Sequence, residues 1–322
     1  MKNIYLNIYR PNSINMKKVK KNVESNNVIG LPTETVYGLA ANAYSDKSVK
    51  KIFKLKKRPV LNPLIIHFKN LKDLKKDAIC NNSFIKLYKT LCPGPITFIL
   101  NKNPKSKISK IANAGKKTIA VRFPKHRVAR SLLKILNVPL AAPSANISSK
   151  LSPTCAKDVV DEFGNKVKFI LDGGKCQIGL ESTILDLTGK PNILRLGSIT
   201  AEKIQKILKK KIAINKNPKK IKGPGQFKFH YSPGIPVIMN RKYREENQAF
   251  VGFGKKFKEG KNQFNLSKNG SLNEAANNLY KTMRKIKKRN FKSIAVAKIP
   301  NIGLGCVIND RLKKASYKWA NQ

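Results

Sequence analysis

The residues best suited to chemistry in this sequence stand beside short apolar runs, where the strands of a sheet would end. An apolar run at 28–31 leads directly into Thr33, Glu34 and Thr35. Five further segments carry polar or cationic side chains in such places: Lys56, Arg58, Asn62, His67, Thr118, Arg122, Ser144, Asn146, Ser182 and Arg195. Hydroxyl, amide and guanidinium groups hold phosphate or carboxylate oxygens, so the pattern predicts a site for an anionic ligand of moderate size.

The placement of the arginines favours this prediction. The formal net charge is +50, but lysine outnumbers arginine 56 to 11, so much of the charge is explained by drift toward lysine at exposed positions. Three of the eleven arginines, Arg58, Arg122 and Arg195, nevertheless stand at the strand ends. Each segment taken alone could be a surface turn. Six such segments together favour a site.

Two residues keep more than one interpretation. Glu34 could act as a general base, but a glutamate in a turn could equally cap backbone N–H groups. His67, within Leu-Ile-Ile-His-Phe, is a structural histidine on its spacing alone. No spacing of Ser, His and Asp, or of Cys and His, predicts a nucleophile. Neither of the common glycine-rich phosphate loops is present, so any nucleotide is held in another way.

Alternating elements position these residues. Apolar runs predict strands at 28–31, 64–68, 96–100, 118–121, 138–142, 168–171, 182–187 and 192–196, with helices after Ser45 and over 200–210. The pattern predicts an α/β fold with a mixed twisted sheet and helices in residues 1–208. Residues 209–234, rich in Lys, Gly and Pro, read as a linker. Two strands, a helix from about residue 271 and a further strand predict a smaller α/β domain over 235–322.

Composition limits the other classes of function. Five scattered cysteines and three histidines predict no disulfide framework and no protein-bound metal. No run of about 18 apolar residues predicts a membrane span, and no signal peptide is indicated, so we expect a cytoplasmic protein without a membrane partner. The positive charge attracts polyanions, which leaves weak, non-specific tRNA binding open.

Several of these segments together resemble the YrdC-like family of threonylcarbamoyl-AMP synthases. In order, they are PTETVYGLAANA, KKRPVLNPLIIH, VRFP, PSANIS with LSPT, and GLESTILDL with ILRLG. The resemblance covers roughly residues 16–210. GLGCVINDRLKKAS, after a linker that ends in HYSP, resembles the long form of the family, whose additional C-terminal domain is expected to be Rossmann-like.

The resemblance implies an ATP-dependent condensation. L-threonine and bicarbonate or CO₂ would give N-carboxythreonine, which attacks the α-phosphate of ATP and releases pyrophosphate. The product, threonylcarbamoyl-AMP, would pass to a tRNA threonylcarbamoyl-transferase complex that modifies the adenosine next to the anticodon. The implied cofactor is ATP with Mg²⁺ held mainly by the phosphates, and no tightly bound cofactor is expected.

The resemblance also assigns roles to residues. Those implied to bind threonine are Thr35, His67, Arg122, Ala142 and Ser182, with Arg122 pairing with the carboxylate. Those implied to bind ATP are Lys56, Arg58, Asn62, Thr118, Ser144, Asn146, Ser152, Arg195 and Tyr231, where Lys56 and Arg58 are catalytic through their charge and Tyr231 closes over the nucleotide. Three positions depart from the family pattern: Lys57 replaces a common glycine, and Gly223 and Lys228 replace an expected serine and arginine.

Two alternatives compete with this function. A strongly basic chain with a concave sheet could be a non-catalytic protein that binds double-stranded RNA or tRNA. The fold could also serve another carbamoyl-adenylate enzyme, such as the carbamoyltransferase of hydrogenase maturation, but the acylphosphatase and zinc-finger segments of that relative are missing from this sequence. Threonine rather than serine as the amino acid rests on the resemblance alone.

Overall fold

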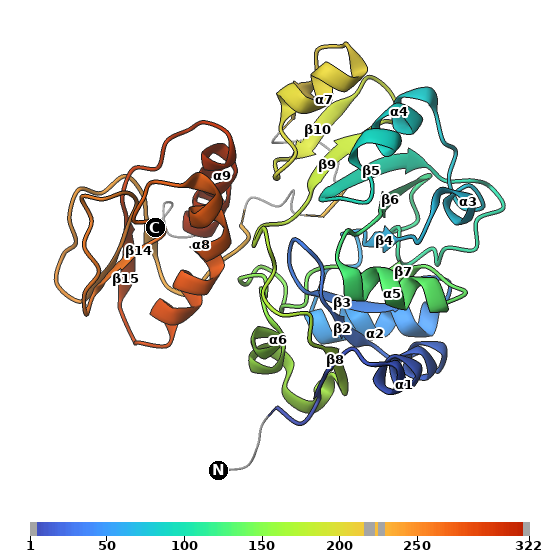
Figure 1. Cartoon of the computed structure of the whole chain (residues 1–322), viewed down its shortest axis with the longest axis horizontal. Coiled ribbons are helices and arrows are strands. Elements are labelled where there is room, and N and C mark those ends of the chain that lie inside the picture. Colours follow the sequence, from blue (N-terminus) through green and yellow to red (C-terminus); the bar gives the residue numbers. More distant parts are fainter. Residues whose placement is uncertain (1–4, 216–222, 225–228, 318–322) are drawn as a thin grey trace.

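The protein folds around two sheets of different size. The computed structural model describes residues 5–215, 223–224 and 229–317. Figure 1 shows the large sheet with its helices on one side and the small sheet on the other, with helices α8 and α9 between them. The predicted mixed sheet and the second, smaller α/β sheet are both present.

The large sheet mixes parallel and antiparallel pairs. In the described residues it has eleven strands in the order β1-β8-β2-β3-β7-β4-β6-β5-β9-β10-β11. Their bounds are β1 (Ile8–Tyr9), β2 (Ile29–Leu31), β3 (Gly38–Asn42), β4 (Ile65–His67), β5 (Ile96–Asn101), β6 (Thr118–Arg122), β7 (Leu140–Ala141), β8 (Phe169–Leu171), β9 (Thr183–Asp186), β10 (Asn192–Arg195) and β11 (Ala213–Ile214). Every strand predicted for the large sheet is confirmed, whereas β1, β11 and the central strand β3, which lies between β2 and β7, were missed.

The α-helices of this part cover the sheet, and all but the one over Ala156–Phe163 begin at a residue whose side chain accepts a hydrogen bond from the first turn. They are α1 (Ser13–Glu24), α2 (Asp46–Lys56), α3 (Leu71–Leu74), α4 (Asn82–Leu91), α5 (Arg127–Ile135), α6 (Ala156–Phe163) and α7 (Ala201–Leu208), with a short 3₁₀ helix at Gly164–Lys166. The predicted cap of α2 is confirmed, because the Ser45 hydroxyl accepts from the Ser48 N–H. Thr200 caps α7 in the same way.

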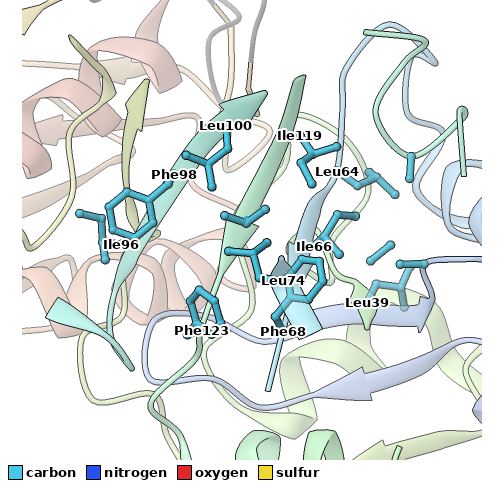
Figure 2. Packing of buried hydrophobic residues seen from close by; sticks show 14 of the residues in the cluster. Leu39, Leu64, Ile66, Phe68, Leu74, Ile96, Phe98, Leu100, Ile119 and Phe123 are labelled. Atoms are coloured by element: carbon cyan, nitrogen blue, oxygen red, sulfur yellow. The ribbon is translucent and has the colours of Figure 1, made fainter. Parts of the chain in front are cut away.

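Strand alternation separates the core from the site. In Figure 2, Ile66 and Phe68 of the β4 segment and Phe98 and Leu100 of β5 point into one apolar cluster. The residues that alternate with core residues along a strand point to the opposite face of the sheet. In β6, for example, Val121 lies in the same apolar cluster and Arg122 points to the other face. The strands thus bury one face in the main core, while the other face carries smaller apolar clusters, such as Ile65, Ile99 and Ala120, together with polar side chains at the strand ends.

The small sheet is parallel. Its order is β12-β15-β13-β14. The strands are β12 (Val237–Ile238), β13 (Gln248–Gly252), β14 (Gln263–Asn265) and β15 (Ser293–Val296), and the helices are α8 (Leu272–Lys287) and α9 (Leu304–Ser316). The parallel arrangement with packed helices confirms the expected Rossmann-like class. Among the described helices, none is long and apolar enough to span a membrane.

The segment predicted as a linker begins with a strand. Ala213 and Ile214 form β11, which pairs in parallel with β10 at the edge of the large sheet. The sequence prediction of an irregular chain from residue 209 is therefore wrong for these two residues. Backbone groups at the exposed edge of β10 offer partners to any extended segment that passes, which lysine-rich composition does not reveal.

Candidate active site

A pocket opens on the polar face of the large sheet, where strands from distant parts of the sequence meet. Parallel β4 and β6 place His67 opposite Arg122, and antiparallel β5 places Thr97 opposite the same arginine. Parallel pairing of β5 with β9 brings the residue before Thr183 to this end of the sheet. The sheet register alone therefore gathers His67, Arg122 and Ser182.

Nine of the predicted site residues line this pocket: Thr35, Arg58, His67, Arg122, Ala142, Ser144, Ser182, Arg195 and Tyr231. Thr33, Val36, Gly38, Ile65, Pro143, Glu181, Pro224 and His230 complete its wall. The space inside is about 40 Å³. Ligand pockets of nucleotide size measure roughly 300–1,000 Å³, so the walls must separate to admit one.

Glu34 forms a buried ion pair with Arg122. The Arg122 Nη2 atom lies 2.8 Å from Glu34 Oε1, and the Lys125 N–H donates to Glu34 Oε2 at 3.1 Å. The structure favours the capping interpretation of Glu34 and adds a pairing role that the sequence did not suggest. Arg122 Nε has no hydrogen-bond partner within the described residues, so this guanidinium keeps a donor for a ligand.

His67 is buried, and both of its ring nitrogens lack a hydrogen-bond partner within the described residues. Burial, with a smaller effect of Arg122, lowers the pKa of His67 well below its usual value. The ring is therefore neutral near pH 7. A neutral imidazole can donate from one nitrogen and accept at the other, which suits an amino or hydroxyl group of a small ligand.

The neutral state of His67 predicts a pH-dependent stability. Because the folded-state pKa lies below the ordinary value, the unfolded chain binds the extra proton first as pH falls below about 6.5. Stability should therefore fall by up to about 1.4 kcal/mol per pH unit from this group. We expect the melting temperature of His67→Gln to depend less steeply on pH between 6.5 and 5 than that of the wild type. Parallel curves would contradict a neutral, buried His67.

The strongest positive charge lies on one side of the pocket. Arg58 donates from Nε to the Asn62 carbonyl at 3.0 Å and from Nη2 to the Pro63 carbonyl at 2.9 Å. Burial and the charge of Arg195 lower the pKa of Arg58 to about 9. Burial and the charge of Arg58 also lower the pKa of Lys56. A bound anion would offset the repulsion between these buried cations. The cluster is therefore suited to hold phosphate groups.

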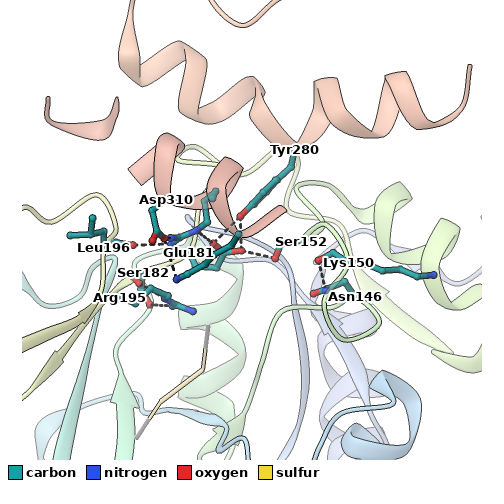
Figure 3. Close-up of polar contacts among 11 residues, drawn as sticks. Asn146, Lys150, Ser152, Glu181, Ser182, Arg195, Leu196, Tyr280 and Asp310 are labelled. Carbon is teal, nitrogen blue, oxygen red and sulfur yellow. Dashed lines mark hydrogen bonds and ion pairs between the residues drawn. The ribbon is translucent and has the colours of Figure 1, made fainter. Parts of the chain in front are cut away.

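Lys56 itself stands behind the pocket wall. Its Nζ donates to the Ser144 and Asn146 carbonyls at 2.5 and 2.6 Å. The side-chain amide of Asn146 donates to the Ile147 and Lys150 carbonyls, which closes the same loop (Figure 3). Lys56 thus fixes the loop that presents Ser144 to the pocket.

The remaining predicted residues divide between wall and surroundings. Arg195 donates from Nε to the Ser182 carbonyl at 3.0 Å and from Nη2 to the Ser182 hydroxyl at 3.1 Å. Ser152 donates to Glu181 at 2.6 Å, one step behind the wall. Asn62 contributes its carbonyl to Arg58. Thr118 lies at the far end of β6, on the same strand face as Arg122 but outside the pocket.

Tyr231 comes from the end of the expected linker and is buried against the pocket. Its ring stacks on Tyr280 at a centroid distance of 5.9 Å, and the Arg311 guanidinium lies 4.8 Å from its centroid. The Tyr231 hydroxyl has no partner among the described residues. Burial raises its pKa to about 12, so the hydroxyl is protonated and can donate to a ligand.

The departures from the family pattern have different structural outcomes. Lys57 is the C-cap of α2 at φ +49°, a left-handed conformation that explains why glycine is common there. A Cβ at Gly223 would meet Ile184 and Ile99 at 3.5 Å, which is ordinary contact, so a serine would fit. Lys228 lies outside the described residues.

The left-handed cap gives a prediction on stability. Lys57→Gly should stabilise the protein by up to about 1 kcal/mol because glycine adopts this conformation without strain. Lys209, the C-cap of α7 at φ +53°, offers a matched control whose replacement by glycine should have a similar effect. Denaturant unfolding of both variants tests this, and a destabilised Lys57→Gly would show that the lysine side chain contributes more than its strain costs.

Several residues of the site escaped sequence reasoning. Glu181 and His230 line the pocket, and Tyr280 and Arg311 of the C-terminal helices stand directly behind it. Glu181 carried one usable signal, as an acidic residue directly before a predicted site serine in a chain with only 17 acidic residues. Arg311 carried another, as an arginine among lysines. Their partners could not be deduced from either signal.

Comparison with known proteins shows the family of the chain. Residues 21–197 match a family model described as telomere recombination, and residues 199–316 match one described as the threonylcarbamoyl-AMP synthase C-terminal domain. Threonylcarbamoyl-AMP synthases of Pyrococcus abyssi and Bacillus subtilis are 36% and 32% identical, each over 91% of this chain and 92% and 90% of their own. A crystal structure of the P. abyssi Sua5 protein with L-threonine superposes with a TM-score of 0.88 at 33% identity, covering 96% of both chains.

Proposed function

Because the chain belongs to the family of threonylcarbamoyl-AMP synthases, we propose that the pocket at the ends of β4 and β6 is its catalytic site. The enzyme condenses L-threonine and bicarbonate or CO₂ with ATP, and yields threonylcarbamoyl-AMP and pyrophosphate. It is a nucleotidyltransferase that supplies the threonylcarbamoyladenosine modification of tRNA. The observation that carries this assignment is the gathering of Arg58, Arg122 and Arg195 around one pocket with His67, whose ring nitrogens have no hydrogen-bond partner among the described residues.

The threonine half of the site would lie over β4, β6 and β9. Arg122 keeps its Nε donor for the amino-acid carboxylate while Nη2 holds Glu34. His67 and the hydroxyls of Thr35 and Ser182 would bind the polar groups of threonine, and Ala142 offers a small apolar contact to its methyl group. The contact with Glu34 supports this assignment, because it fixes the Arg122 guanidinium while leaving its Nε donor to a ligand.

The ATP half would lie on the side of Arg58 and Arg195. Both guanidiniums are buried beside the pocket, and their hydrogen bonds within the described residues go to carbonyl and hydroxyl oxygens rather than to a carboxylate, so phosphate oxygens are suited to neutralise them. Ser144 would donate to a phosphate from the loop that Lys56 holds. Asn62, Asn146, Ser152 and Thr118 would shape the surroundings of the nucleotide, and Tyr231 would close over it.

Catalysis of this reaction would rest on positioning of the substrates and on positive charge, and it needs no nucleophilic side chain. In-line attack of the carboxyl oxygen of N-carboxythreonine on the α-phosphate concentrates negative charge on phosphate oxygens, which Arg58 and Arg195 would stabilise. We propose Lys56 and Arg58 as the catalytic pair. Lys56 would act through its positive charge from behind the loop that carries Ser144. A closed site would also keep N-carboxythreonine from water.

Magnesium would enter with ATP as part of the substrate. Within the described residues, no group of three His, Cys, Asp or Glu side chains could hold a metal ion. The two carboxylates nearest the pocket, Glu34 and Glu181, are both paired with arginines. The phosphates of ATP are therefore the ligands we assign to Mg²⁺, where the ion offsets their charge and orients them.

The division of labour along the chain is also a proposal. Residues 1–208 would form the catalytic domain, 209–234 a linker over the site, and 235–322 the small C-terminal domain. We propose that the product passes to a tRNA threonylcarbamoyl-transferase complex in the cytoplasm. Direct tRNA binding would be weak, non-specific and strongly dependent on salt, because it would rest on dispersed lysines.

Product identification tests the function. Incubation with ATP, Mg²⁺, bicarbonate and L-threonine should yield threonylcarbamoyl-AMP, detectable by mass spectrometry, and L-serine in place of threonine measures selectivity for the methyl group. Formation of AMP without the adenylate would contradict the proposal. The comparisons support the enzyme rather than a non-catalytic RNA-binding protein.

A further inference from the structure

An arginine of the C-terminal helix α9 reaches the back of the pocket wall. Arg311 is only 1% exposed, and its Nε donates to Glu181 Oε2 at 2.9 Å. Its Nη2 donates to the Leu196 carbonyl at 2.8 Å, and Nη1 pairs with Asp310. Figure 3 shows Glu181 close to Ser182, Arg195, Leu196 and Asp310. Arg311 therefore joins the small domain to the residue that precedes a predicted substrate contact.

The carboxylate of Glu181 is held from both domains. Ser152 donates to Oε1 at 2.6 Å, and the Tyr280 hydroxyl of α8 lies 3.1 and 3.0 Å from the two oxygens. Burial alone would raise the pKa of Glu181, but Arg311 and Arg195 outweigh it and hold the pKa at about 2. The carboxylate is thus ionised and has two arginines within electrostatic reach, one from each domain.

The two arginines have different surroundings. Arg311 satisfies Glu181 directly, whereas Arg195 donates to Ser182 and faces the pocket. A carboxylate and a phosphate compete for the same face of a guanidinium, because both offer paired oxygens to its fork of donors. If Glu181 were not neutralised from behind, its nearest alternative cation would be Arg195.

We propose that Arg311 is a positioning residue of the reaction: it neutralises Glu181 and thereby leaves Arg195 available to the phosphates of ATP. This inference rests on the proposed function of the pocket. The small domain then completes the nucleotide site without touching the substrate. The same guanidinium supports the ring of Tyr231, so Arg311 also fixes a second residue of the ATP side.

Steady-state kinetics of Arg311→Met tests the inference. Without the Arg311 guanidinium, the Glu181 carboxylate should pair with Arg195 and compete with the phosphates of ATP. The KM for ATP should then rise by about tenfold or more, and the KM for threonine by less than about threefold. The double variant Arg311→Met/Glu181→Gln should recover most of the ATP affinity, because an amide does not compete for Arg195. The double variant also removes the unpaired buried charge, so it remains informative where the single variant fails to fold.

A second contact between the domains provides the control. Lys288, the C-cap residue of α8, pairs with Asp161 of α6 at 2.8 Å on the surface. Lys288→Met should leave both KM values unchanged. Equal rises in both KM values for Arg311→Met, or a double variant no better than Arg311→Met, would overturn the inference. ATP affinity measured by equilibrium dialysis gives the same comparison independently of turnover. If the wild type bound ATP but were inactive, the proposed function would be refuted, whereas the ATP affinities of the Arg311 variants would still test this inference.

Discussion

Arg58→Ala is expected to lower kcat for pyrophosphate release by about 10³-fold while the protein stays folded. Removal of a single preorganised donor from a developing oxyanion typically costs about 10²–10³ in rate. Arg58 is placed for a larger effect because its charge is buried and, within the described residues, its hydrogen bonds go to the Asn62 and Pro63 carbonyls rather than to a carboxylate. These two carbonyls lose their donor in the variant, which should cost about 1–3 kcal/mol of stability.

The control for this variant is an arginine outside the pocket. Arg244 is exposed and donates only to the Glu245 carbonyl among the contacts of the described residues, so Arg244→Ala should retain full activity. Circular dichroism and thermal unfolding of Arg58→Ala separate loss of catalysis from loss of fold. Unchanged pyrophosphate release in a folded Arg58→Ala would remove this residue from the mechanism.

The second large effect concerns Arg122. Arg122→Lys should raise the KM for threonine by about 10²-fold, because an ammonium cannot hold Glu34 and a substrate carboxylate with the planar fork of a guanidinium. Lysine keeps the positive charge beside Glu34, so the buried carboxylate is not left unpaired, as it would be in Arg122→Ala. The KM for ATP should change little because Arg58 and Arg195 supply the nucleotide side.

The ion pair between Arg122 and Glu34 can also be tested from the side of Glu34. Glu34→Gln should weaken threonine binding less than Arg122→Lys, since it leaves the guanidinium in place and alters only its support. Threonine affinity is measured by isothermal titration with the free enzyme, apart from turnover. A normal threonine KM in Arg122→Lys, with a raised KM for ATP instead, would contradict the assignment of the two halves of the site.

Sequence periodicity predicted the strands of the large sheet but not the order in which they pair. The runs at 64–68 and 118–121 gave β4 and β6, and their polar ends were recognised as site residues. Their register, His67 opposite Arg122, comes from a sheet in which sequence neighbours are separated by crossovers. The strand β3 was missed because Gly38–Asn42, with one glycine, two alanines and a single large apolar residue, Leu39, has little β-propensity. A Cβ at Gly38 would meet Ala142 and Pro143 at 3.4 Å, which leaves little room for a side chain beyond a methyl group.

The interactions between the domains were beyond sequence reasoning. Arg311 and Glu181 are 130 positions apart, and nothing in local pattern relates a glutamate before β9 to an arginine in α9. The same holds for Glu34 and Arg122, each of which was singled out without its partner. Residue type and strand-end position identified which side chains could bind anions, whereas pairing of buried charges depends on tertiary packing.

The most direct measurement is pyrophosphate release from ATP by the purified full-length protein, with L-threonine and bicarbonate omitted in turn. The proposed site predicts release only when both are present, because the attacking oxygen belongs to N-carboxythreonine. Release that needs threonine but continues in carefully bicarbonate-free buffer would indicate a simple aminoacyl-adenylate. No release with both substrates present would contradict the assignment of this pocket as an adenylate-forming site.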